Sequence, residues 1–242
     1  MKYWLTSMVE APFTVGVLGG MGPEATIDFQ YRVLRATPAQ DDADHVRLLI
    51  DNNPAVPSRI EFVIHGRGAS PGPTLAAMAK GLESLGADCL VMPCNTAHLF
   101  VPQIRDATAV EFISMIDTTV AAVGKVNKVG LLASTAVIQT DLYSGAFTAT
   151  GVPAVVPDSD GQQKVMALIR NTKAGKAGAA DAQLLQRIAA DLVARGAECL
   201  VVACTELSVL SADLHIGVPV VDAAQVLAEE TVVRALRSKA HE

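Results

Sequence analysis

Short apolar runs alternate with longer amphipathic stretches along most of this chain. The runs are continuous and rich in Val, Leu and Ile, which is typical of parallel strands that are buried on both faces. They predict strands at residues 15–18, 46–50, 89–92, 112–114, 129–132, 154–156, 199–202 and 218–221. The stretches between them predict helices at residues 23–36, 73–85, 117–123, 160–171, 179–194 and 223–237. Because strands that alternate with helices indicate βαβ units, the expected fold class is α/β with doubly wound, mostly parallel sheets.

The pattern occurs twice in the chain. Residues 80–100 and 190–210 align with a shift of 110 positions, and each segment reads as a helix, a Gly turn, an apolar strand and then a Cys. The shared residues are Leu82, Gly86, Ala87, Cys89, Leu90, Val91 and Cys94, which fall on Leu192, Gly196, Ala197, Cys199, Leu200, Val201 and Cys204. This similarity indicates an internal duplication.

Weaker similarities extend the duplication to other segments. Residues 14–26 resemble residues 128–140, and each segment reads as an apolar strand, a turn of small residues and the start of a helix. Residues 111–119 resemble residues 217–225, and each segment reads as a strand followed by an Asp that can cap the next helix. The repeating unit therefore spans nearly half of the chain.

We expect two pseudo-symmetric α/β domains with the functional site in the cleft between them. The first domain carries Cys94 and consists of residues 1–115 together with the closing strand and helix, residues 219–242. The second domain carries Cys204 and consists of residues 116–218. Ligands of doubly wound sheets bind beyond the carboxyl ends of the strands. Both cysteines fall at such ends.

Composition excludes several classes of protein. Half of the 242 residues are apolar and 18% are charged, which indicates a compact globular protein with a substantial core. The net charge is −6 and the Lys and Arg residues are scattered, which argues against nucleic acid or an anionic membrane as a partner. No apolar run approaches the roughly 20 residues that span a bilayer, and residues 1–13 lack the apolar core of a signal peptide. We therefore expect a cytoplasmic protein with reduced thiols.

The four cysteines raise the question of a metal site, which strand geometry argues against. Cys89 and Cys94 lie five residues apart along a predicted strand, which separates them by roughly 16 Å and places them on opposite faces. Two such residues can neither chelate one ion together nor form a disulfide. The same holds for Cys199 and Cys204. We expect Cys89 and Cys199 to be buried core thiols, and we expect no metal.

Cys94 and Cys204 each follow an apolar strand and precede the start of a helix. The positive end of a helix dipole lowers the pKa of a nearby thiol and so raises its thiolate fraction. Since the two residues stand at equivalent positions of the repeat, they predict two reactive thiols that face each other across a cleft.

Three chemistries would use such a pair of thiols. Dithiol redox chemistry is disfavoured because the chain has no Cys-x-x-Cys motif. Nucleophilic catalysis would need a paired base, for which His98 is the nearby candidate. In the third, one thiolate removes a proton from a carbon and the other thiol donates one to the opposite face, which inverts a stereocentre.

The segments around these cysteines resemble a known family. VMPCNTAHLF (residues 91–100) and LVVACTELSVL (residues 200–210) closely resemble the two cysteine motifs of the aspartate/glutamate racemase family, which acts without pyridoxal phosphate. VGVLGGMGPEAT (residues 15–26) and DNNPAVPSR (residues 51–59) resemble the aspartate racemase branch in particular. The resemblance covers almost the whole chain from Thr14 onward. The glutamate racemase branch usually continues its second motif as Cys-Thr-His, whereas this chain has Cys-Thr-Glu.

The resemblance implies a two-domain fold with the site between the domains, commonly in a homodimer. It implies that Cys94 and Cys204 are the two catalytic bases and that no cofactor takes part. It also implies that Arg59, at the end of the Asn-Pro-x-x-Pro-x-Arg segment, binds a carboxylate of the substrate. Lys164 matches a family lysine that would bind the other carboxylate or the side chain.

Further polar residues are expected around the substrate. Asn95, Thr96 and Thr205 are expected to hold its α-carboxylate and amino group. Thr135, with Ser134 at the turn after the second opening strand, is an additional candidate. Two other residues, His98 and Glu206, could adjust the pKa values of the thiols or could serve as structural hydrogen-bonding groups.

The loop from Gly16 to Gly22 invites comparison with nucleotide-binding loops. Its glycines do not follow the spacing G-x-G-x-x-G, and no acidic residue follows a second strand at the expected distance. We interpret it as a tight turn that brings the backbone close to a small substrate, with Met21 over the cleft.

The sequence therefore predicts a cofactor-independent amino-acid racemase that acts by two-base proton transfer, with aspartate as the first expectation. Alternatives on the same scaffold are a racemase for glutamate or for many amino acids, and an enzyme resembling maleate isomerase. A non-catalytic amino-acid-binding protein is a further alternative. The expected partner is a small amino acid, most of all a dicarboxylic one.

Overall fold

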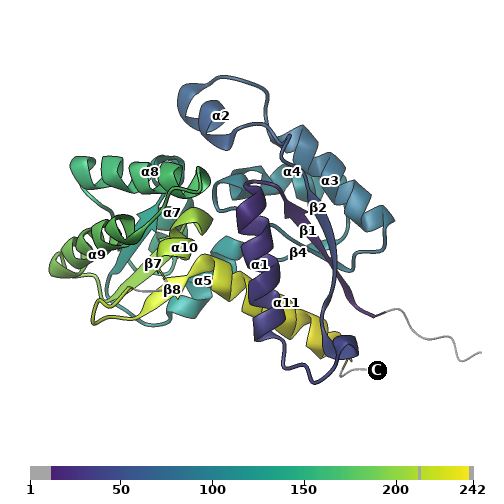
Figure 1. The fold of residues 1–242 in the computed structure, drawn as a ribbon. Coiled ribbons are helices and arrows are strands. Elements are labelled where there is room, and N and C mark those ends of the chain that lie inside the picture. Colours follow the sequence, from purple (N-terminus) through teal and green to yellow (C-terminus); the bar gives the residue numbers. More distant parts are fainter. Residues whose placement is uncertain (1–11, 212–213, 240–242) are drawn as a thin grey trace, which may run out of the picture.

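The computed structural model describes residues 12–211 and 214–239 and divides them into two halves, each built on a four-stranded parallel sheet (Figure 1). The first sheet has the order β2-β1-β3-β4 and consists of β1 (Thr14–Gly19), β2 (Arg47–Asn52), β3 (Cys89–Val91) and β4 (Glu111–Phe112). The second has the order β6-β5-β7-β8 and consists of β5 (Val129–Ala133), β6 (Ala154–Val155), β7 (Cys199–Ala203) and β8 (Val220–Asp222). The predicted α/β class with parallel sheets is confirmed.

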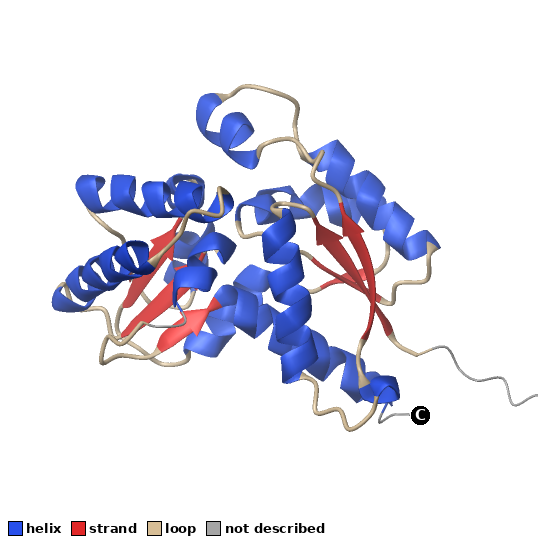
Figure 2. Ribbon diagram, in the orientation of Figure 1, coloured by secondary structure: helices blue, strands red, loops and turns tan. Residues whose placement is uncertain are grey.

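Helices cover both sheets and alternate with the strands (Figure 2). The long helices lie close to their predicted places and are α1 (Pro23–Ala36), α3 (Gly72–Ser84), α5 (Met115–Val123), α8 (Ser159–Lys173), α9 (Ala179–Ala194) and α11 (Ala223–Lys239). The short helices were not predicted and are η1 (Asp42–Asp44), α2 (Arg59–His65), η2 (Thr96–Phe100), α4 (Val101–Ala107), α6 (Thr135–Gln139), α7 (Leu142–Ala149) and α10 (Thr205–Ser211). Each of these spans only one or two turns, which is too short for a helical period to show in the sequence.

The two halves pack their strands and helices in the same way. Val15 of β1 pairs with Cys89 of β3, and Val129 of β5 pairs with Cys199 of β7. Each central strand also carries a glycine that lets a helix approach closely. A methyl group on Gly16 would lie 2.7 Å from the side chain of Leu90 and 2.9 Å from that of Ala87, with Leu82 at 3.2 Å.

The equivalent glycine of β5 meets the equivalent neighbours. A methyl group on Gly130 would lie 2.5 Å from the side chain of Leu200 and 3.0 Å from that of Ala197, with Leu192 at 3.1 Å. These three residues stand at the repeat positions of Leu90, Ala87 and Leu82. The internal duplication read from the sequence is therefore present in the packing.

The last helix of each half crosses to the other half. Helix α5 follows β4 of the first sheet but packs against α7, β7 and β8 of the second half, whereas α11 follows β8 of the second sheet and packs against α1 and β1 of the first half as well as against β7 and β8. We expected both the closing strand and the closing helix, within residues 219–242, to join the first domain. For the strand this is wrong, because Val220 of β8 pairs with Leu200 of β7 at the edge of the second sheet. Only α11 returns, and whether the halves are separate folding domains stays a prediction.

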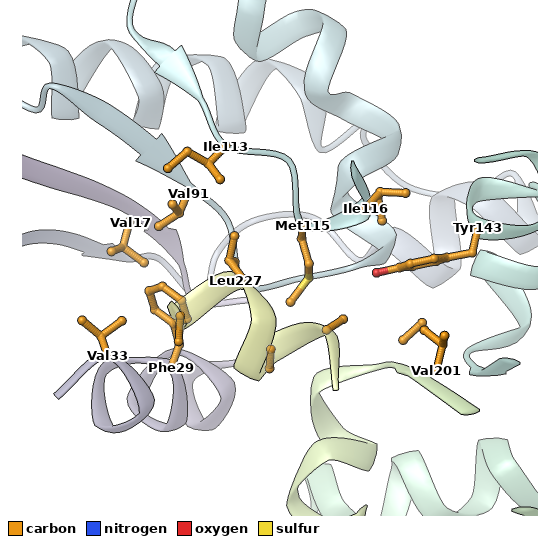
Figure 3. Close-up of a cluster of buried hydrophobic side chains, with 14 of the residues drawn as sticks. Val17, Phe29, Val33, Val91, Ile113, Met115, Ile116, Tyr143, Val201 and Leu227 are labelled. Atoms are coloured by element: carbon orange, nitrogen blue, oxygen red, sulfur yellow. The ribbon is translucent and has the colours of Figure 1, made fainter. Parts of the chain in front are cut away.

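One hydrophobic core joins the two halves. Val17, Phe29 and Val91 of the first half belong to the same buried cluster as Tyr143 and Val201 of the second. Figure 3 shows Leu227 of α11 and Met115 of α5 between the two groups. The outer face of each sheet has its own core, one under α3 and α4 and one under α8 and α9. This arrangement fixes the carboxyl ends of β3 and β7 relative to each other.

Residues 1–11, which make up most of the segment that lacks the apolar core of a signal peptide, lie outside the described residues. Within the described ranges, no helix combines the length and the apolar character needed to cross a membrane.

Candidate active site

A small cavity lies between the two halves, beyond the carboxyl ends of β3 and β7. Its volume is about 50 Å³ and both halves line it. The lining residues are Met21, Ser58, Arg59, Ile60, Cys94, Asn95 and Thr96 from the first half, and Ser134, Ile169, Lys173, Ala203, Cys204, Thr205 and Glu206 from the second. The two cysteines of the repeat therefore meet at one site, at the edge where ligands of such sheets bind.

Cys94 lies after β3 and is 7% exposed. Its carbonyl oxygen is 2.9 Å from Nδ1 of His98, and the Nε2 atom of His98 accepts the Met115 N–H at 3.0 Å. Burial lowers the pKa of His98 to about 4, so the ring is neutral at pH 7. Because Nε2 is the acceptor, Nδ1 carries the proton and donates a hydrogen bond to the carbonyl oxygen of Cys94. His98 thus fixes the backbone that carries the thiol.

Cys204 directly follows β7 and is 6% exposed. Its thiol donates a hydrogen bond of 3.0 Å to Oε2 of Glu206, and Lys173 Nζ lies 3.3 Å from Oε1 of the same carboxylate. Burial, followed by the charge of Glu206, raises the pKa of the Cys204 thiol well above its ordinary range, while Lys173 acts in the opposite direction. Cys204 is therefore a protonated thiol in this structure.

Ser208 takes the place of His98 in the second half. It stands four residues after Cys204, and its hydroxyl donates to Oδ1 of Asp222 at 2.7 Å and lies 3.4 Å from the Cys204 carbonyl oxygen. The other oxygen of Asp222 pairs with Arg32 of α1 at 3.1 Å. Each cysteine backbone is thus tied to the start of the helix that crosses to the other half.

Arg59 opens α2 and reaches the cavity beside the glycine turn. Its guanidinium donates to the carbonyl oxygens of Met21 at 2.9 Å and Pro57 at 3.1 Å. The turn is tight, because Gly20 has a φ of +88° and a methyl group there would lie 2.2 Å from the backbone of Asn53. The prediction that this turn places Met21 at the cleft is confirmed.

Comparison with known proteins decides the family. The model of a family described as Asp/Glu/Hydantoin racemase matches residues 18–231. The chain belongs to this racemase family. Since racemases are isomerases, the predicted enzyme class is confirmed as well. The predicted resemblance to aspartate and glutamate racemases thus holds over nearly the whole described fold.

Individual relatives differ in what they act on. The chain is 25% identical to the broad-specificity amino-acid racemase RacX of Bacillus subtilis, over 90% of this chain and 96% of RacX. It is 30% identical to the structure of Picrophilus torridus aspartate racemase, with a TM-score of 0.79, over 92% of this chain and 94% of that one. The glutamate racemase RacE1 of Bacillus anthracis shares the fold at 18% identity and a TM-score of 0.63, over 94% of this chain and 82% of that one.

Most of the residues predicted for the racemase site line the cavity. Cys94 and Cys204 are both present, as are Arg59, Asn95 and Thr205. Thr96 is present too, and its hydroxyl lies 3.3 Å from that of Ser134, so this contact joins the two halves at the cavity. The roles assigned to these residues stay predictions.

Lys164 and Thr135 are not among the residues that line the cavity. Lys164 forms an ion pair with Asp160 on a half-exposed face of α8. Thr135 accepts a hydrogen bond of 3.2 Å from Gln162 instead. The cavity lysine is Lys173, nine residues after Lys164, and nine residues turn a helix by about 180° relative to its starting face. The two lysines therefore point in opposite directions from one helix.

Lys173 could have been found from the pattern of α8. Val165 and Ile169 are buried and stand one helical turn apart, and Lys173 continues the same stripe toward the C-terminal end of the helix. Ser58 and Ile60, which flank Arg59, were also missed. Helix α2, which Ser58 caps and which includes Ile60, is too short to give a periodic signal.

The other two cysteines lie within the strands. Cys89 and Cys199 are completely or almost completely buried, as predicted. Burial, followed by the charge of Glu111, raises the pKa of Cys89 to about 12, and burial also raises the pKa of Cys199. In the part of the chain that the structure describes, no group of three or more His, Cys, Asp or Glu residues is arranged to hold a metal ion.

Proposed function

We propose that this member of the racemase family interconverts L and D amino acids without a cofactor, with Cys94 and Cys204 as the two bases. The observation that carries the proposal is that both cysteines, equivalent in the repeat, line one cavity between the halves. A racemase acts in both directions, and a duplicated site offers one proton-transfer group to each face of the substrate.

The proposed reaction transfers one proton at each face. One thiolate removes the α-proton and becomes a thiol, which leaves a carbanion at the α-carbon. The opposite thiol then donates its proton to the other face and becomes a thiolate. The substrate leaves with inverted configuration, and the enzyme has exchanged the protonation states of its two cysteines. The reverse reaction or exchange with solvent restores the first state.

The neighbours of Cys204 suit the role of proton donor in the first step. Its thiol is protonated and bonded to Glu206, so the free enzyme is ready to donate from this side. Cys94 would then act as the first base. The enantiomer whose α-proton faces Cys94 is the one that the free enzyme converts first.

The same cavity offers groups that stabilise the carbanion. The α-proton of an amino acid is a very weak acid, so donors and cations must lie where negative charge develops on the carboxylate. Arg59 and Lys173 bring positive charge to the cavity, and Asn95 and Thr96 bring hydrogen-bonding groups. Contacts to backbone carbonyls and to Glu206 hold the two cations in place.

Aspartate is the first substrate that we propose. Support comes from the 30% identity to an aspartate racemase of known structure. A broad-specificity racemase is the second candidate, because RacX matches nearly the full length of the chain. Glutamate, a reaction resembling that of maleate isomerase, and binding without catalysis remain alternatives. The homodimer and the cytoplasmic location stay predictions.

The test is incubation of the purified, reduced protein with L-aspartate, without added cofactor, followed by chiral chromatography. We expect D-aspartate to accumulate until the two enantiomers are equal. If aspartate does not react, a panel of other amino acids follows, and conversion of several supports the broad-specificity candidate. If none of the amino acids in the panel is racemised, the proposal is contradicted. A covalent adduct of maleate with one cysteine would then favour the isomerase, and binding without exchange of the α-proton would favour a binding protein.

A further inference from the structure

Tyr143 lies in α7 of the second half and reaches a cavity residue of the first half. It is completely buried, and its hydroxyl donates a hydrogen bond of 2.6 Å to Oδ1 of Asn95, the residue after Cys94. Figure 3 shows the ring at one end of the shared core, with the hydroxyl directed toward Met115. The ring of Phe147 stacks on it with a centroid distance of 6.3 Å. Packing therefore fixes the position of the hydroxyl.

This hydrogen bond fixes the orientation of the Asn95 amide. Burial raises the pKa of Tyr143 above its ordinary range, so the hydroxyl keeps its proton and acts as the donor. The acceptor must then be the oxygen of Asn95, which leaves its Nδ2 atom for another partner. Nδ2 is buried and has no hydrogen-bond partner among the described residues. Asn95 itself is 4% exposed and lines the cavity.

Buried amide donors without a partner are uncommon and unfavourable in folded proteins. Because Asn95 lines the cavity, a ligand bound there can bring the acceptor that Nδ2 lacks. A carboxylate supplies such an acceptor, and it carries the charge that strengthens the bond. Every amino acid has this group next to the carbon that the proposed reaction inverts.

We infer that Tyr143 is a positioning residue, which holds the Asn95 amide so that Nδ2 binds a carboxylate oxygen of the substrate. The inference rests on the proposed function for the identity of the ligand. Without the tyrosine hydroxyl the amide is free to turn over and to present its oxygen to the carboxylate, which repels it. The hydroxyl of Thr119 lies 3.5 Å from that of Tyr143, but its proton is already donated to the Met115 carbonyl at 2.6 Å, so Thr119 offers no donor in place of the tyrosine.

The first test compares Tyr143→Phe with the wild type in steady-state racemisation. We expect KM to rise about tenfold, the loss of roughly one hydrogen bond to a charged group, and kcat to fall as well, because the same bond stabilises the charge that develops on the carboxylate. Tyr31→Phe makes the same chemical change on an exposed tyrosine of α1 and should leave both constants unchanged. A purely structural role would lower thermal stability and the amount of active enzyme but would leave KM at the wild-type value. That last result would overturn the inference.

A double-mutant cycle tests whether Tyr143 acts through Asn95. In an Asn95→Ala background, Tyr143→Phe should have no further effect on KM. Asn95→Asp keeps an acceptor for the tyrosine hydroxyl but replaces the free donor with an oxygen, so its KM should rise more than that of Tyr143→Phe. If Tyr143→Phe raised KM by the same factor with Asn95 and with Ala at position 95, the inference would be contradicted. This comparison holds even if the variants lose some stability.

Binding of succinate separates this inference from the proposed function. Succinate is a dicarboxylate without an amino group, and calorimetry measures its affinity for wild type and Tyr143→Phe without any turnover. If the wild type racemises no amino acid but binds succinate about tenfold more tightly than the variant, the proposed function fails and the positioning role stands. Equal affinities of the two proteins overturn the positioning role. A wild type that neither racemises nor binds succinate contradicts both.

Discussion

Cys94 and Cys204 occupy equivalent positions in the two halves and are buried to the same degree, but their surroundings differ. Each lies beyond a central strand of its sheet, and the residue four positions later, His98 or Ser208, contacts its carbonyl oxygen. The thiol of Cys204 has a carboxylate partner, Glu206. Among the described residues, the thiol of Cys94 makes no hydrogen bond.

The comparison separates what the duplication keeps from what it changes. The glycine in the central strand, the helix that packs on it and the strand order are the same in both halves, and these features set where the thiols lie. The side chains around the two thiols have diverged: Glu206 bonds to Cys204 and raises the pKa of that thiol, and no equivalent carboxylate bonds to Cys94 among the described residues. The two-base racemisation that we propose needs two groups that face one carbon, only one of which carries the proton at the start.

The largest expected effect is the loss of either cavity thiol. Cys94→Ala and Cys204→Ala should each reduce racemisation by about a thousandfold or more, since each variant lacks one of the two proton-transfer groups. Cys89→Ala and Cys199→Ala are matched controls from the strands that precede the cavity thiols and should keep kcat near that of the wild type. Chiral chromatography gives the rates. Racemisation at the wild-type rate by either cavity variant would exclude the two-base mechanism.

The second expected effect is a pH dependence of stability that arises from His98 and has no counterpart at Ser208. The pKa of His98 in the folded protein is about 4, below the ordinary value of about 6.5, so the unfolded chain binds the proton first as the pH falls. This difference in pKa leaves the free energy of unfolding unaffected above about pH 6.5. As the pH falls to about 4, it lowers the free energy of unfolding by up to about 3 kcal/mol. Urea unfolding between pH 7 and pH 4 measures the loss.

Two variants test whether His98 causes this loss of stability at low pH. His98→Gln should remove most of the pH dependence, whereas Ser208→Ala, the matched change in the second half, should keep it. If His98→Gln shows the same dependence as the wild type, burial of the neutral imidazole is not its source.

A third effect should be equal in both halves. Gly16→Ala and Gly130→Ala each force a methyl group into at least one contact shorter than 3 Å. We expect each to lower the free energy of unfolding by about 1–3 kcal/mol, the usual cost of an overpacked core. Thermal and urea unfolding give the values. A large loss for one variant and none for the other would show that the scaffold is less symmetric than its packing indicates.

The smallest effect concerns Glu206. Glu206→Gln removes a negative charge beside Cys204, so the pKa of that thiol should fall and iodoacetamide should label it about tenfold faster at pH 8. Lys173→Met removes the opposing charge and should slow the labelling. Peptide mass spectrometry follows Cys204 and Cys94 in the same sample. Labelling of Cys204 that does not respond to either change would contradict the role given to Glu206.

The sequence predicted the features that repeat over several turns or strands. Continuous apolar runs located the strands, and the duplication located both thiols. The closing strand was assigned to the wrong half because its helix crosses over while the strand does not, and no local pattern separates the two. Lys164 was taken from the family resemblance, and Lys173 was missed although the buried stripe of α8 leads to it.

Tyr143 shows a different limit of sequence reasoning. It lies 48 positions from Asn95, in a short helix without a clear period, and meets it only because of the way in which α7 packs against α5 and α6. Contacts of this kind depend on how the two halves associate. Neither spacing nor composition reports that association.

The most direct test of the two-base account is racemisation of protiated L-aspartate in D2O, or of the amino acid that the enzyme converts fastest. Mass spectrometry would follow the α-deuterium in each enantiomer at early times. The account predicts that the new D enantiomer carries deuterium from the opposite thiol, while the remaining L enantiomer still carries protium. Deuterium that enters both enantiomers equally from the start would indicate a single exchanging base and would contradict the account.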